Sequence, residues 1–77
     1  MSAHDAKEAA VAVMNTIELT GVSAESWGDA AREALKEASR TIRGINKLHV
    51  LGTSAVVEDG VIAEYHTEVR IFFEIET

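Results

Sequence analysis

The C-terminal part of the chain alternates in side-chain character, which is the pattern of a β-strand with two different faces. One face carries mainly apolar residues: Tyr65, Thr67, Val69, Ile71, Phe73 and Ile75. The other face is mostly polar or charged: His66, Glu68, Arg70, Phe72, Glu74 and Glu76. A second β-rich run ends at Glu58-Asp59-Gly60, and an Asp-Gly pair between two such runs is a strong hairpin signal. We therefore predict two antiparallel strands joined at this turn.

An earlier strand is predicted over residues 11–20, where the sequence VAVMNTIELT is rich in valine, isoleucine and threonine. Gly21 ends this run. The preceding residues are polar and rich in alanine, which indicates a loosely held tail. We expect residues 1–12 to form a flexible N-terminal extension and residues 13–77 to form the folded domain.

A helix is predicted after Ser26, which has the side chain of a good N-cap, and Asp29 follows it at the spacing of a capping box. The apolar positions recur every three or four residues: Trp27, Ala30, Ala31, Ala34, Leu35, Ala38 and Ile42. The opposite side of the helix is charged: Asp29, Arg32, Glu33, Lys36, Glu37 and Arg40. Gly44 is the predicted stop. The alanine stripe would let this helix lie close to a sheet.

The predicted order of elements is β-α-β-β, an α+β fold in which one helix packs on one face of a three-stranded antiparallel sheet. One helix covers only one face, so the other face is open to water or to a second subunit. The chain has 77 residues, 12 of its apolar residues are alanine, and it has no cysteine. A core this small is marginal without a metal, a cofactor or self-association. The sequence therefore favours a homo-oligomer.

The charge balance excludes several classes of partner. The net charge is −6, which argues against nucleic acid and against an anionic membrane surface. Acidic residues near the N-terminus replace the basic segment of a signal peptide, so we expect a cytoplasmic protein. The excess of acid lies mainly in residues 44–77, which hold six acids and two bases.

No catalytic motif is present: the sequence lacks a glycine-rich phosphate loop, HExxH and GxSxG, and we expect no enzyme activity. A two-residue turn at Asp59-Gly60 would place His49 opposite Arg70 and Leu51 opposite Glu68.

His49, His66 and Glu68 would then share the open face, and imidazole with carboxylate can bind a divalent cation. A carboxylate-only calcium site shared between chains is an alternative, and so are simple hydrogen bonds to neighbouring residues. For Trp27 we expect packing in the core or at an interface, with a stacking platform for an aromatic ligand as the alternative.

Three stretches of the sequence resemble the dodecins: IELTGVS at 17–23, SWGDAAREALKEASRTIRGI at 26–45 and VEDGVIAEYHTEVRIFFEIE at 57–76. The resemblance covers about residues 13–76. It implies a small β-α-β-β protein that assembles into a hollow homododecamer. It also implies flavin, as FMN or riboflavin, bound in stacked pairs between subunits.

The resemblance also identifies two altered positions. Lys47 stands where the family has the tryptophan that stacks on the flavin, and His66 stands where the family has a glutamine that bonds the ring edge. An ammonium group cannot replace an aromatic stacking surface. Some dodecin-like proteins are described as binding calcium instead. Three interpretations therefore remain: a flavin-binding shell, a shell that binds divalent cations, and a structural shell without a ligand.

Overall fold

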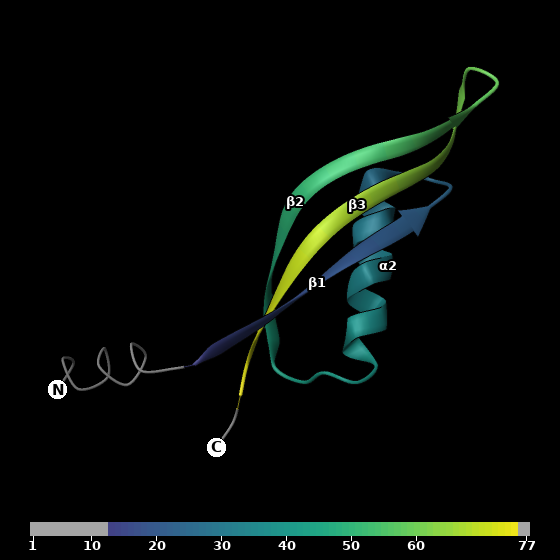
Figure 1. The fold of residues 1–77 in the computed structure, drawn as a ribbon. Helices are drawn as coiled ribbons and strands as arrows, with labels where there is room; N and C mark the ends of the chain where they lie inside the picture. The colour runs from purple at the N-terminus through teal and green to yellow at the C-terminus, as the bar shows by residue number, and fades with distance from the viewer. Residues whose placement is uncertain (1–12, 76–77) are drawn as a thin grey trace, which may run out of the picture.

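The computed structural model describes residues 13–75 and has the predicted order of elements (Figure 1). Strand β1 spans Met14–Ser23, helix α2 spans Trp27–Ser39, strand β2 spans Ile45–Glu58 and strand β3 spans Val61–Glu74. The three strands form one antiparallel sheet in the order β1-β3-β2. This confirms the predicted fold. The expected N-terminal extension lies outside the described residues.

Strand β1 continues past the glycine at which we expected it to end. It runs to Ser23, and Gly21 pairs with Thr67 on β3. The predicted end at Gly21 is wrong because this glycine is where α2 touches the sheet. A Cβ atom there would lie 1.8 Å from the carbonyl oxygen of Ala30. Gly21 therefore serves close packing within the strand and does not terminate it.

Helix α2 begins as predicted and ends earlier. The Ser26 hydroxyl accepts a hydrogen bond from the Asp29 amide at 2.9 Å, which confirms the N-cap. The helix ends at Ser39, and a short loop leads to Gly44, which has a φ of +78°. We had predicted that Gly44 ends the helix, and this is wrong. Gly44 instead lies directly before the first residue of β2. Among residues 13–75 no helix is long and apolar enough to cross a membrane.

The core lies between α2 and the β1–β3 half of the sheet. The helix contacts β1 and β3 extensively and touches β2 little. Its alanine stripe is buried against Val69 and Ile71, which are inaccessible to solvent at the centre of β3. The buried helical residues are Ala30, Ala34 and Ala38. Small side chains let the helix axis approach the sheet, at the cost of burying little apolar area.

The β2–β3 hairpin turns as predicted but contains bulges. Asp59 and Gly60 both have positive φ values, 53° and 77°, as a two-residue hairpin turn with the twist of the strands requires. His49 lies opposite Arg70, as predicted.

Gly52 lies opposite Glu68, so the predicted pairing of Leu51 with Glu68 is wrong. The register shifts by one residue near Val56 and shifts back near Leu51. Such bulges cannot be seen in the alternation of the sequence alone.

Candidate functional site

The face of the sheet turned away from α2 carries most of the candidate residues, and we call it the open face. Its central row comes from β3, in the order His66, Glu68, Arg70 and Phe72. The neighbouring strands β1 and β2 supply one residue on each side of every member of this row. The alternation predicted from sequence therefore places these side chains together as expected.

Lys47 and Phe72 form a pair at one end of the open face. They lie opposite each other on β2 and β3, and the Lys47 ammonium is 4.6 Å from the centre of the Phe72 ring. This is a cation–π contact. The resemblance to the family places a stacking aromatic ring at position 47, and this chain has the cation of Lys47 there. The aromatic ring beside it is that of Phe72, on the neighbouring strand β3. The ammonium covers that ring.

Arg70 occupies the next place in the row. Its Nε and Nη2 atoms both donate to Oε2 of Glu18, at 3.1 and 2.8 Å. On the other side of Arg70 lies His49. Because a guanidinium is always positively charged, Arg70 repels any further cation that would bind at His49.

Glu68 lies between Thr20 of β1 and Gly52 of β2. With Glu18, Thr20 and Leu51 it lines a shallow cleft of about 200 Å³. Sequence reasoning paired Glu68 with histidines and missed Glu18. The alternation of Thr16, Glu18 and Thr20 was the available signal, but only the strand order puts β1 beside β3.

The described part of one chain, residues 13–75, does not bring together a full set of metal ligands on this face. Among residues 13–75 there is no group of three or more histidine, cysteine or carboxylate side chains placed to hold a metal ion.

His66 lies at the other end of the row from Lys47. Its Nε2 atom is 3.0 Å from Oε1 of Glu64, and Ser54 lies opposite it on β2. Phe72, the partner of Lys47, is six residues further along β3, which corresponds to roughly 20 Å. Lys47 and His66 of one chain therefore cannot contact the same small ligand. A pocket that uses both requires two subunits.

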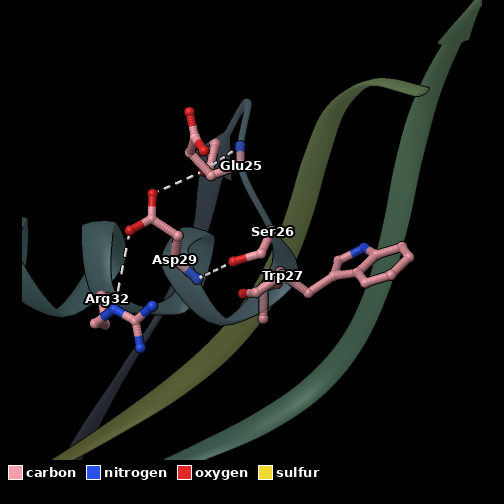
Figure 2. A network of polar contacts seen from close by, with 7 residues as sticks. Glu25, Ser26, Trp27, Asp29 and Arg32 are labelled. Atoms are coloured by element: carbon pink, nitrogen blue, oxygen red, sulfur yellow. Dashed lines mark hydrogen bonds and ion pairs between the residues drawn. The ribbon is translucent and has the colours of Figure 1, made fainter. Parts of the chain in front are cut away.

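Trp27 lies at the start of α2 and packs across the hairpin (Figure 2). Its indole nitrogen donates to the backbone carbonyl of Ser54 at 2.8 Å. Its ring meets Tyr65 edge to face, with 4.8 Å between the centroids. The side chain is still 40% exposed. In one chain Trp27 is thus a packing residue with an uncovered surface.

The polar network at the helix start fixes the loop that joins β1 to α2 (Figure 2). Ser23 donates to a carboxylate oxygen of Asp29 at 2.8 Å and accepts from the Glu25 amide at the same distance. Arg32 lies 3.9 Å from the other carboxylate oxygen of Asp29. The Asp29 carboxylate therefore accepts the hydrogen bond of the Ser23 hydroxyl and does not complete the predicted capping box. The network is structural, because its contacts hold the loop and the helix in place.

The comparisons with known proteins agree with this architecture. The family model described as Dodecin matches residues 13–76. The chain belongs to the dodecin family. The comparison with curated proteins gave no match. The family assignment confirms the resemblance found in the sequence.

Solved dodecin structures superpose closely on the chain. The dodecin from Streptomyces coelicolor is 25% identical, with a TM-score of 0.83, covering 87% of this chain and 96% of that one. A variant of the Thermus thermophilus dodecin is 26% identical, with a TM-score of 0.82, covering 86% and 98%.

A third structure, from Mycobacterium tuberculosis, is described as a calcium-chelating antigen, calcium dodecin, with a novel calcium-binding site. It is 28% identical, with a TM-score of 0.73, covering 83% of this chain and 91% of that one.

Proposed function

We propose that this dodecin is a non-enzymatic protein that assembles into a hollow homododecamer and binds a small ligand between subunits. Family membership supports both the assembly and the absence of catalysis. The observation that carries the proposal is the open face, which gathers charged and aromatic side chains that no helix or strand within residues 13–75 covers. A small core with an uncovered sheet face gains stability from copies that bury it.

Native mass spectrometry of the untreated protein tests this proposal, because it measures subunit number and bound ligand together. We expect a dodecamer, with a mass in excess of twelve chains where a ligand is retained. A stable monomer at micromolar concentration would contradict the assembly.

The ligand of this shell differs from that of a flavin-stacking dodecin, and we propose weak flavin binding. Phe72 is the aromatic side chain of the open face within residues 13–75, and the Lys47 ammonium lies over it. A flavin ring would have to displace this cation before it could stack. The double variant Lys47→Trp with His66→Gln should raise flavin affinity by about tenfold or more, through the stacking energy of each new ring pair.

A fluorescence-quenching titration with riboflavin measures that gain. Lys36→Trp, on the exposed surface of α2, is the matched control that adds an indole away from the open face. Tight binding by the unaltered protein, or an equal gain in the control, would contradict the location of the pocket.

The second candidate ligand is a divalent cation, and we propose calcium because it prefers oxygen ligands. Two observations favour it: Glu18 and Glu68 line one cleft, and one of the similar structures is described as a calcium dodecin. In a symmetric shell such carboxylates recur in every subunit and can meet their symmetry mates, where their repulsion favours a bound cation. Glu74, the last residue of β3, and Glu76 beyond it add to the excess of acid in residues 44–77.

Thermal unfolding in millimolar calcium and in excess chelator, at constant ionic strength, tests this candidate. Linkage gives about 2.7 kcal/mol per site when the free cation is 100 times its Kd. Glu68→Gln should remove the calcium-dependent rise, whereas Glu33→Gln on the outer surface of α2 should keep it. Equal melting temperatures in calcium and chelator would rule the cation out.

A further inference from the structure

The lysine and arginine side chains of the sheet gather at one end of the open face. Lys47 and Arg70 are the two such residues in the three strands within residues 13–75. Lys47 lies opposite Phe72, and His49 lies opposite Arg70. The two pairs form neighbouring rows of the same face, about 7 Å apart along the strands. We call Lys47, His49 and Arg70 the basic cluster.

Arg70 is held in place and still has hydrogen-bond donors to offer. Its Nε and Nη2 atoms both donate to one carboxylate oxygen of Glu18 on β1, whereas the two N–H groups of Nη1 have no partner among residues 13–75. Because β1 and β2 lie on opposite sides of β3, Glu18 approaches Arg70 from the side away from His49. A guanidinium fixed in this way loses less conformational entropy when it binds an anion.

Lys47 has no carboxylate partner in the described part of the chain. The ion pairs within residues 13–75 join other residues, and the Lys47 ammonium lies over the Phe72 ring. A ring face offers no lone pair to the three N–H groups of the ammonium, so they remain available to an anion. His49 is exposed, and an imidazole donates at least one N–H group in either protonation state. Three side chains therefore present donors together.

The acids around the basic cluster limit the size of the ligand that it can accept. Glu18 offsets part of the charge of Arg70 on the β1 side, so the positive potential is strongest beside β2. Glu68 and Glu74 occupy the rows of the open face that flank the cluster. Because charge interactions fall with distance and are screened by salt, a small anion beside Lys47 interacts mainly with the cluster. An extended polyanion would reach the flanking carboxylates and be repelled.

We propose that the basic cluster binds the phosphate group of a small ligand. A phosphate monoester presents three acceptor oxygens and nearly two negative charges at pH 7, which suits three donor side chains better than the two coplanar oxygens of a carboxylate. This inference rests on the proposed role of the open face as a ligand surface, and it names the class of ligand. The three side chains belong to one chain, so the site does not depend on how copies assemble.

Isothermal titration calorimetry tests the site with inorganic phosphate and with glycerol 3-phosphate, in calcium-free buffer at pH 7. We expect both probes to bind, and acetate at the same ionic strength to bind at least tenfold more weakly. Tighter binding of the ester would assign the site to a phosphorylated organic molecule, and equal binding would assign it to the free ion. Equal affinity for acetate, or no binding of either phosphate at millimolar concentration, would overturn the proposal.

A single charge removal locates the site. Lys47→Gln should weaken phosphate binding about tenfold, because it removes a hydrogen bond from a charged donor. Lys36→Gln, on the exposed surface of α2, removes the same charge elsewhere and should bind phosphate as the wild type does. Both side chains are exposed, so the fold should survive, and circular dichroism checks this. Equal losses in the two variants would mean that only the overall charge of the protein matters.

The double variant Lys47→Trp with His66→Gln should exchange one ligand for the other. It should bind riboflavin more tightly and phosphate about tenfold more weakly, and an unchanged phosphate affinity would contradict the site. Native mass spectrometry of the wild type keeps the two proposals apart. A dodecamer that binds no phosphate would overturn the phosphate site and leave the shell, whereas a monomer that binds phosphate would overturn the shell and leave the site.

Discussion

The two halves of this small protein use their residues differently. Where α2 covers the sheet, Ala30, Val69 and Ile71 are buried and the backbones come into close contact at Gly21. On the open face and at the tip of the β2–β3 hairpin, large side chains remain accessible to solvent, and opposite charges pair across the strands. The covered half therefore stabilises the chain, while the uncovered half is available for other copies and for ligands.

The largest expected effect is at the helix–sheet contact. Gly21→Ala places a Cβ 1.8 Å from the Ala30 carbonyl oxygen, so helix and strand must separate. We expect a loss on the order of 3 kcal/mol or more in the free energy of unfolding, measured by urea denaturation at fixed protein concentration. Gly28→Ala is the control, because its Cβ would find no atom closer than 3.9 Å and should stabilise the helix by about 0.5 kcal/mol. A tolerated Gly21→Ala would show that the contact is looser than described.

Substitutions at two neighbouring residues of β3 compare the covered face and the open face of the sheet directly. Ile71→Ala removes a side chain with no solvent exposure and should lower the free energy of unfolding by about 3 kcal/mol. Phe72→Ala, on the open face, should lower it by less than half of that amount while weakening assembly or ligand binding. Urea denaturation and native mass spectrometry of both variants measure the difference. Equal losses of stability would mean that the two faces do not differ in role.

A smaller loss of stability is expected from a substitution at the N-cap of α2. Ser26→Ala removes the acceptor of the Asp29 amide and should cost about 1 kcal/mol, whereas Ser26→Asp should keep the cap and most of the stability. Thermal unfolding followed by circular dichroism measures both. Similar melting temperatures for the Ala variant and the wild type would indicate that the loop network around Ser23 and Asp29 is sufficient without the cap.

The smallest effect is expected from removing residues 1–12. The family match begins at residue 13, and we propose that the folded domain begins there as well. The shortened chain should change in stability by less than about 0.5 kcal/mol and should assemble as the full chain does. A large fall in melting temperature or in oligomer mass would assign the extension a part in the domain.

Local patterns predicted the elements of the fold well. The alternation of β3, the Asp59-Gly60 turn and the Ser26 cap each act over a few residues, and all three are present in the structure. The error at Gly21 lies where distant segments meet. Gly21 looked like a strand end because glycine usually weakens strands, but the nearby helix backbone is what requires it.

The candidate site could be predicted only in part. Lys47, His49, His66 and Glu68 do lie on β2 and β3, at positions consistent with one open face. Sequence reasoning predicted that His49 lies opposite Arg70, but it could not show that Glu18 is the ion-pair partner of Arg70, because that contact joins β1 to β3. The register that pairs His49 with Arg70 also pairs Lys47 with Phe72. The sequence did not show that the Lys47 ammonium lies over the Phe72 ring, because that contact depends on the conformations of the two side chains.

The sequence by itself determined the number, order and type of the elements, together with the faces on which their side chains lie. These properties depend on side-chain periodicity, capping and turn geometry, which act between near neighbours. Tertiary structure alone decided that β3 is central, that α2 leaves β2 uncovered, and that bulges bring Gly52 opposite Glu68. Those outcomes depend on packing between residues far apart in the chain, where one alanine stripe and one glycine set how closely the helix meets the sheet.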